Sequence, residues 1–320
     1  MNTAVKSILK LDEEKRTFDV RVEILLSTYN GEKYLKEQLD SLLRQDGIEN
    51  IKISIRDDGS TDNTCEILKV YEERYNFNVT YGINIGVNAS MTELLKNADE
   101  TFDFFAFCDQ DDVWNDNRVS VAISALKRRS NEKPLLWGCM EQLSDENLHA
   151  ISMMPIPEHL GNFYNAIVQN KLYGHTQIFN KPMRNLILRV PANVIYMYDW
   201  IAYILASTFG EVLYENRCLG KYRQHGDNAI GCELKRFSLM KKRLKRLLTN
   251  DYKRVSIQMA CIYEIFYNKL NEGQQKELRR FLNSRQNFFK RLLYIFITKI
   301  KRNTYLESLE FRILYLFNFY

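Results

Sequence analysis

Short apolar stretches alternate with helical patterns over the first third of the chain. Four of these stretches predict strands, at residues 22–27, 51–55, 78–81 and 102–107. Between the first two, Leu35, Leu39 and Leu42 recur at a spacing that places them on one face of a helix. The resulting β-α-β order predicts an α/β fold, with a mostly parallel sheet and helices on both of its faces.

The pattern is less regular beyond residue 130. Residues 194–209 are expected to form a helix that carries Asp199, and the chain reads as helical and basic from about residue 235. We therefore expect three parts, namely an N-terminal extension at 1–20, an α/β domain at 21–234 and a basic, mainly helical region at 235–320.

Charge is distributed unevenly along the chain. Residues 235–320 hold 20 lysines and arginines against 6 acidic residues, whereas the preceding 234 residues hold 25 against 34. Interleaved basic and apolar residues are typical of an amphipathic helix lying on anionic lipid. A basic helical subdomain packed on the acidic body, or a contact between subunits, would give the same pattern. Nucleic acid is not expected as a partner, because no recognised binding motif accompanies the charge.

Cysteine spacing and terminal sequence indicate the compartment. The six cysteines show neither CxxC nor zinc-finger spacing and are expected to be reduced thiols. The first residues, MNTAVKSILKLDEEKR, lack the apolar core of a signal peptide, and no apolar run approaches the roughly 18 residues that span a bilayer. We expect a cytoplasmic protein, which the basic region would bring to the inner face of the cell membrane.

Polar clusters follow three of the predicted strands, at the point where each strand ends. They are Thr28-Tyr29-Asn30, Asp57-Asp58 and Asp109-Gln110-Asp111-Asp112. Ligands of parallel α/β sheets bind beyond the carboxyl ends of the strands. The three clusters are therefore expected to converge on one crevice.

The acidic run after the fourth strand predicts a cation site. Two carboxylates about 5 Å apart repel by roughly 3 kcal/mol at an effective dielectric near 20. A run that holds Asp109, Asp111 and Asp112 therefore needs a compensating charge, and Mg²⁺ or Mn²⁺ with carboxylate, phosphate and water ligands supplies it. A solvated acidic turn is the alternative, and it is the more common explanation when such a run stands alone.

The other two clusters suit a nucleotide. Tyr29 can stack on a base, while Thr28 and Asn30 can bond its edge or the ribose; a plain turn is the alternative. Asp58 can accept a hydrogen bond from a uracil-like N3–H or a ribose hydroxyl, and its alternative is an Asx-turn or a helix cap. Dinucleotide oxidoreductases and P-loop NTPases are disfavoured, because neither GxGxxG nor GxxxxGK[ST] is present.

Candidate groups for catalysis lie further along the chain. Asp199 stands between Tyr198 and Trp200, and apolar walls would raise its pKa and make it a better general base. Arg223 can hold a diphosphate by a two-pronged contact, and His225 can bind a metal or a phosphate. Structural roles are the alternatives for all three residues, and a structural role is the more common explanation for His175.

Several of these segments together resemble one known family. They are VEILLSTYNGEKYL, ISIRDDGSTDNT, NIGVNAS, FFAFCDQDDVW and YDW followed by YRQHGDNAIG. In combination, over about residues 21–232, they are similar to family 2 of the inverting nucleotide-sugar glycosyltransferases, and more closely to its bacterial rhamnosyltransferase-like branch. This resemblance implies a GT-A fold, a nucleotide-diphosphate sugar as donor and Mg²⁺ or Mn²⁺.

The resemblance also implies roles on the donor side. Thr28, Tyr29 and Asp58 would hold the base and ribose, with Asn30 beside them, and Asp109 would lie near the ribose.

On the side of the chemistry, Asp111 would ligate the metal with Asp112 close by, and Asp199 matches the catalytic base. Arg223 and His225 match a segment that closes over the diphosphate.

Two departures from the branch concern the sugar and the acceptor. Tyr198 stands where the branch usually has histidine, and His175 stands where relatives commonly have cysteine.

The expected function is transfer of rhamnose or another hexose to a hydroxyl of a growing, lipid-linked bacterial surface polysaccharide such as a capsule. A nucleotidyltransferase acting on sugar phosphates and an inactive GT-A partner protein are the rivals. An oligomer is compatible with the sequence.

Overall fold

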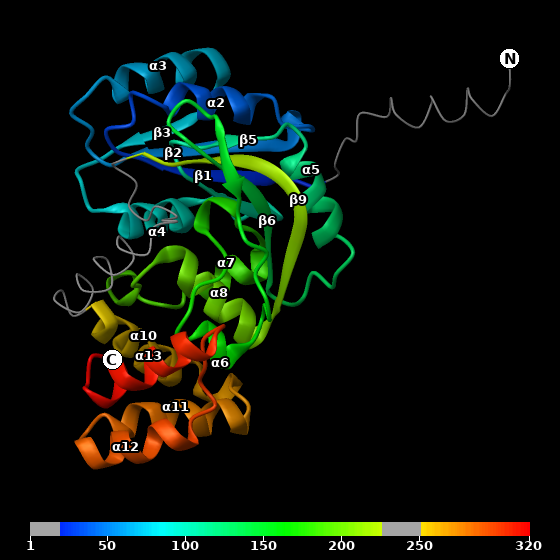
Figure 1. Cartoon of the computed structure of the whole chain (residues 1–320). Helices are drawn as coiled ribbons and strands as arrows, with labels where there is room; N and C mark the ends of the chain where they lie inside the picture. The colour runs from blue at the N-terminus through cyan, green and yellow to red at the C-terminus, as the bar shows by residue number, and fades with distance from the viewer. Residues whose placement is uncertain (1–19, 226–250) are drawn as a thin grey trace, which may run out of the picture.

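The computed structural model describes residues 20–225 and 251–320 (Figure 1). Its strands form one sheet in the order β3-β2-β1-β4-β8-β6-β9-β5, with β7 paired to β6. Their bounds are β1 (Val22–Thr28), β2 (Ile51–Asp57), β3 (Asn78–Tyr81), β4 (Phe104–Cys108), β5 (Val113–Trp114), β6 (Leu135–Ser144), β7 (Ala150–Met153), β8 (Ile178–Asn180) and β9 (Glu211–Arg223). The four strands predicted from the sequence are β1 to β4.

The sheet is mostly parallel, as expected. Strands β3, β2, β1 and β4 run parallel to one another, and β6 is parallel to β9. The short β8 runs antiparallel between β4 and β6, and β5 and β7 are antiparallel to their partners. The carboxyl ends of β1, β2 and β4 therefore lie side by side, and the polar clusters follow these ends.

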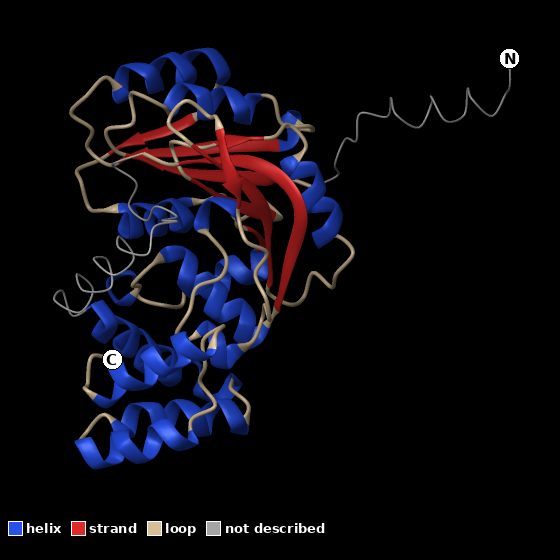
Figure 2. Cartoon of the chain, viewed as in Figure 1, coloured by secondary structure: helices blue, strands red, loops and turns tan. Residues whose placement is uncertain are grey.

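Helices cover both faces of the sheet (Figures 1 and 2). Those on one face are α2 (Leu35–Leu43), α3 (Thr64–Tyr75) and α5 (Arg118–Leu126), and those on the other are α4 (Val87–Asn97), α6 (Phe163–Ala166), α7 (Lys181–Ile187) and α8 (Tyr198–Phe209). Strand β4 shows the alternation that requires two layers. Phe104 and Ala106 join the apolar core of the first face, while Phe105 and Phe107 join that of the second.

The expected helix at 194–209 begins later than predicted, at Tyr198. A short 3₁₀ turn, η3 (Ala192–Val194), and an extended segment precede it. The side chain of Asn88 fixes this extended segment, because it donates to the Tyr196 carbonyl at 2.9 Å and accepts from the Tyr198 amide at 3.0 Å. A contact from another part of the chain thus sets where α8 begins.

Four further helices pack against the α8 side of the body. They are α10 (Asp251–Phe266), α11 (Glu272–Ser284), α12 (Phe288–Ile297) and α13 (Tyr305–Leu316), and their inner side chains join the same apolar core as α8. The Phe209 and Phe266 rings lie 5.1 Å apart, and the Tyr196 amide donates to Gln258 at 2.9 Å. The helical character expected of this region is confirmed for residues 251–320. The boundary expected at 234 and 235, and all but the last residue of the expected extension at 1–20, lie outside the described residues.

Neither membrane spans nor disulfides occur in the described parts of the chain. Within residues 20–225 and 251–320, no helix has both the length and the apolar character needed to cross a bilayer. Five cysteines fall in these ranges and all are free thiols, at positions 65, 108, 139, 218 and 261.

Candidate active site

Gln110 joins the loop after β1 to the acidic loop after β4. Its Oε1 accepts hydrogen bonds from the Thr28 hydroxyl at 2.6 Å and the Tyr29 amide at 2.9 Å, and its Nε2 donates to the Tyr29 carbonyl at 3.1 Å. A Cβ at position 31 would stand 2.4 Å from Oε1 of Gln110, so a residue other than glycine there would displace this side chain and disturb the contact. The Tyr29 side chain stays 44% exposed and presents its ring at the edge of the site.

Asp58 is buried at the end of β2 and organises the loop that follows β3. Its carboxylate accepts hydrogen bonds from the Ile85 amide at 2.9 Å and the Gly86 amide at 2.8 Å, and it forms an ion pair with Arg56. Its own amide donates to the Thr28 carbonyl at 2.8 Å. Asp58 therefore lies next to the β1 loop, where the resemblance expects the base and ribose. Its contact with a nucleotide stays a prediction.

Asn30 and Asp57 hold the first two loops together. Oδ1 of Asn30 accepts from the Thr61 amide at 2.8 Å, and the Asn30 amide donates to the Ser60 hydroxyl at 2.9 Å. Asp57 forms an Asx-type turn, since its carboxylate accepts from the Gly59 amide at 3.1 Å. The three polar clusters thus converge at one edge of the sheet, which confirms that expectation.

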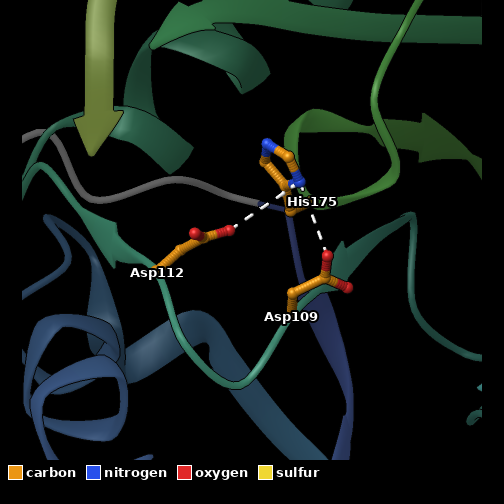
Figure 3. Close-up of side chains that lie close together, drawn as sticks. All are labelled: Asp109, Asp112 and His175. Atoms are coloured by element: carbon orange, nitrogen blue, oxygen red, sulfur yellow. Dashed lines mark ion pairs between the residues drawn. The ribbon is translucent and has the colours of Figure 1, made fainter. Parts of the chain in front are cut away.

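The acidic loop brings Asp109 and Asp112 to His175, which lies in the 3₁₀ turn η2 (Gly174–Thr176) (Figure 3). Nδ1 of His175 is 3.5 Å from a carboxylate oxygen of Asp109 and 3.7 Å from Oδ2 of Asp112. One ligand atom from each of the three residues lies within 4.8 Å of the others. Carboxylate oxygens and an imidazole nitrogen are ligands that suit Mn²⁺.

Asp112 provides a second indication of a cation. The residue is fully buried, and its Oδ2 has no hydrogen-bond partner among the residues that the structure describes. Burial raises the pKa of Asp112 well above its usual value, and His175 offsets this in part. A buried carboxylate oxygen without a partner is costly. The residues present therefore fit a divalent cation at this position.

The residues expected to bind the metal, Asp111, Asp112 and His225, do not form one group in the structure. Asp111 does not join Asp112 but points to His225, with 2.8 Å between Oδ2 of Asp111 and Nε2 of His225. The His225 ring also lies 4.8 Å from the Tyr34 ring. Asp109 lies in the group of Asp112 and His175, and its expected place near the ribose stays a prediction. Metal binding by Asp111 and His225 stays a prediction.

A buried ionic network supports His175 from behind. Nε2 of His175 is 2.6 Å from Oε2 of Glu141 on β6, and Oε1 of Glu141 is 2.6 Å from the guanidinium of Arg118 on α5. Burial alone would raise the pKa of Glu141, but His175 and Arg118 lower it to about 2. Burial would lower the pKa of His175, yet the carboxylates of Glu141 and Asp112 raise it well above its usual value. The network thus fixes the position of His175 and favours its protonated form, so that a cation bound at Nδ1 would displace a proton.

Replacing Arg118 with methionine is expected to destabilise the fold by about 3–5 kcal/mol, because it removes one partner of a fully buried pair and leaves Glu141 undercompensated. The free energy of unfolding from urea titration measures the effect. The Arg129→Met variant is the matched control, because Arg129 pairs with Glu211 at 2.7 Å on the surface and its removal should cost no more than about 1 kcal/mol. Equal losses in the two variants would contradict the structural role of the buried pair.

Asp199 lies in the first turn of α8 and is 5% exposed. Its carboxylate accepts from the Trp200 amide at 2.7 Å and from Asn170 Nδ2 at 2.8 Å. Burial raises the pKa of Asp199 to about 7, and the nearby Asp109 adds to this, while the Trp200 amide and His175 oppose it. A carboxylate with a pKa near neutrality is suited to general base catalysis.

Tyr198 links Asp199 to the acidic loop. Its hydroxyl donates to Oδ1 of Asp109 at 2.9 Å, and its ring packs edge-on against Phe107 at 4.9 Å. Gln177, which lies two residues after His175, donates to the backbone carbonyl of Asp199 at 3.0 Å. The helix that carries the candidate base is therefore attached to the candidate cation site from two sides.

Arg223, at the end of β9, points into the protein. Its Nε donates to the Asp111 carbonyl at 2.8 Å, its terminal nitrogens contact Glu37 and the Glu146 carbonyl, and its guanidinium lies 4.3 Å from the Tyr34 ring. In this arrangement Arg223 fixes the acidic loop. The two-pronged diphosphate contact expected of it stays a prediction, and it would require an exchange of these partners.

Sequence reasoning missed Arg118 and Glu141 as members of the site. It also did not connect His175 with the acidic run. Glu141 carried a usable signal, because it interrupts the apolar run LLWGCM within a buried strand. A charged residue at such a position requires a buried partner. Nothing in the sequence identifies Arg118 or His175 as that partner.

The sheet, with helices on both of its faces and polar residues at the ends of its strands, has the GT-A fold. Residues 23–193 match the model of glycosyl transferase family 2, and the chain belongs to this family. It is similar to the dTDP-rhamnosyl transferase RfbG of Shigella flexneri, with 26% identity over 243 residues that cover 73% of this chain and 83% of that protein.

Two solved structures share the fold. One is S. aureus TarS 1–349 in complex with UDP, with a TM-score of 0.54, 18% identity, and coverage of 93% of this chain and 80% of that chain. The other is the mannosyltransferase PcManGT from Pyrobaculum calidifontis in complex with GDP-Man and Mn²⁺, with a TM-score of 0.50, 10% identity, and coverage of 99% and 87%. At these identities the likeness shows the fold alone.

Proposed function

We propose that this chain is an inverting, cation-dependent glycosyltransferase. It would move a hexose, with rhamnose as the leading candidate, from a nucleoside-diphosphate donor to an acceptor hydroxyl of a growing bacterial surface polysaccharide such as a capsule. The observation that carries the proposal is Asp199, a buried carboxylate with a pKa of about 7. It stands beside a group of two carboxylates and a histidine that suits a cation.

Different residues of the chain act on the acceptor and on the donor. Asp199 accepts the proton of the acceptor hydroxyl, whose oxygen attacks the anomeric carbon from the face opposite the diphosphate, so that configuration inverts. Asn170 and the Trp200 amide keep the carboxylate of Asp199 in place. One carboxylate that acts as base, with no second carboxylate that acts as nucleophile, gives a single displacement, which inverts the configuration.

A divalent cation would be held by Asp109, Asp112 and His175. When bound, it would neutralise the diphosphate that leaves with the nucleotide. On the other side of Gln110, Tyr29 and Asp58 would receive the base and ribose, with Thr28 and Asn30 shaping the loop. This assignment follows the resemblance, and the adjacency of the two loops supports it.

The acceptor is proposed to be lipid-linked, with the protein at the inner face of the cell membrane. The basic character of residues 235–320 supports the contact with the membrane, and the similarity to a dTDP-rhamnosyl transferase supports rhamnose as the sugar. Tyr198, which stands where the branch usually has histidine, uses its hydroxyl to hold Asp109. The replacement of histidine by tyrosine therefore keeps a side chain in contact with Asp109, which argues for an active enzyme.

A panel of nucleotide sugars is expected to identify the donor. At about a hundredfold excess over its dissociation constant, the correct donor with Mn²⁺ adds about 2.7 kcal/mol to the free energy of unfolding. For a chain of this size, this raises the melting temperature by on the order of 5 °C. Differential scanning fluorimetry measures the shift, and chromatography then identifies the product that leaves. Release of pyrophosphate instead of nucleoside diphosphate would contradict glycosyl transfer.

A further inference from the structure

Helix α12 is apolar or aromatic at eight of its ten positions, yet the protein covers only part of this apolar surface. Its ten residues read FFKRLLYIFI, and among them only Tyr294 is fully buried. The side chains of Phe289, Leu293 and Phe296 are 76%, 69% and 75% exposed, and their spacing of four and three residues places them on one face. An exposed apolar patch of this kind ordinarily marks a contact with another protein or with lipid.

The neighbouring helix α13 repeats this feature. Leu306, Leu309, Ile313 and Phe317 are all exposed and recur at helical spacing. The two helices are joined, since Nε of Arg291 on α12 donates to the Leu316 carbonyl at 2.8 Å. They lie at the end of the molecule farthest from α2 and α3 (Figure 1). We call the exposed apolar side chains of α12 and α13 the tip surface.

Positive charge borders the tip surface. Residues 285–320 contain seven lysines and arginines and two glutamates, and Lys290, Lys299 and Lys301 are exposed. A groove of about 260 Å³ at the start of α13 is lined by Lys301, Arg302, Tyr305, Leu309 and Arg312, among others. The buried Nε of Arg312 donates to no residue within the described ranges. The groove thus places the cationic groups of Lys301 and Arg312 beside polar side chains and the apolar Leu309, a combination that suits a lipid phosphate.

We propose that the tip surface docks the protein onto an anionic lipid membrane. The apolar side chains would enter the boundary between head groups and acyl chains, while the bordering lysines meet lipid phosphates. Charge decides between this partner and a second copy of the chain, because two tip surfaces would bring like charges together across an apolar contact. This inference names the surface that would make the membrane contact of the proposed function. It rests on that function for the reason why the protein would dock.

Vesicle flotation of the full chain tests the proposal. Wild-type protein should float with vesicles of phosphatidylcholine and phosphatidylglycerol, and binding should weaken in high salt and with phosphatidylcholine alone. The variant Leu293→Gln/Phe296→Gln should lose about tenfold or more in partitioning. Lys290→Glu should lose at least about fivefold, with wild-type secondary structure by circular dichroism. Val70→Gln is the matched control, because Val70 is 50% exposed on helix α3 at the opposite end of the molecule.

Three outcomes would overturn the proposal. One is a wild-type protein that floats with neither kind of vesicle. Another is a Leu293→Gln/Phe296→Gln variant that floats as well as wild type, because the contact would then lie elsewhere. The third is a dimer in light scattering that this variant dissociates. Flotation needs no turnover, so failure of the enzymatic proposal would appear separately, as loss of transfer to a soluble acceptor.

Discussion

Replacing Asp199 with asparagine is expected to lower turnover by a factor on the order of 10²–10⁴. The amide keeps the shape of the carboxylate and can still accept from the Trp200 amide, but it cannot take the acceptor proton. Donor affinity should stay near the wild-type value, because Asp199 faces the acceptor in the proposed mechanism. Initial rates of nucleoside diphosphate release and donor titrations measure the two quantities. Near-wild-type turnover would remove Asp199 from the mechanism.

The pH dependence supplies an independent check on the same residue. Asp199 acts as a base only when ionised, and burial raises its pKa to about 7. The value of kcat/KM should therefore fall about tenfold for each pH unit below 7 and level off above it. The Asp199→Asn variant should lack this limb, whereas Asp116→Asn on the surface, beside Arg44, should retain it. A limb that persists in Asp199→Asn would belong to another group.

Replacing Asp112 with asparagine is expected to abolish Mn²⁺ binding and to lower turnover by roughly 10²–10³-fold, since metal-ion catalysis is worth several kcal/mol. The substitution removes the charge of a fully buried side chain, while its Oδ1 can still accept from the Arg223 amide, as Asp112 does at 3.1 Å. Electron paramagnetic resonance of Mn²⁺ in the presence of donor measures binding without any need for turnover.

The Asp111→Asn variant is the comparison that locates the cation. Asp111 contacts His225, whereas Asp112 lies with Asp109 and His175. If the cation sits in the latter group, Asp111→Asn retains measurable Mn²⁺ affinity while Asp112→Asn loses it. The reverse result would place the cation between Asp111 and His225, as the resemblance implies for Asp111.

The first half of the sheet could be predicted from the sequence because its strands carry their own signal. Strand β4 is apolar at every position, since both of its faces are covered, and turn residues bound it. Strand β9 carries no such signal. Its residues Glu211–Arg223 are mostly half-buried or exposed and include charged positions, so its pairing with β6 depends on contacts that only the folded chain supplies.

The sequence predicts those parts of the site that are formed by residues close together in the chain. The polar clusters lie at consecutive strand ends, and parallel topology brings them together. The division of the acidic run could not be predicted, because neighbouring side chains in a loop can turn toward different partners. Asp111 turns to His225 and Asp112 to His175, and these histidines come from segments that are far apart in the chain. The selection of His175 depends on Glu141 and Arg118, which no spacing rule connects.

The contact of Gln110 with Thr28 and Tyr29 has a thermodynamic consequence. This contact holds the loop proposed to receive the nucleotide and the loop proposed to receive the cation as one unit. Order gained by one loop on binding is then gained by the other, and binding free energies form a closed cycle. In the proposed function, donor and cation would therefore change each other's affinity by the same factor. The supply of manganese in the cell would set how much nucleotide sugar the enzyme retains, and the supply of nucleotide sugar would equally set how much manganese it retains.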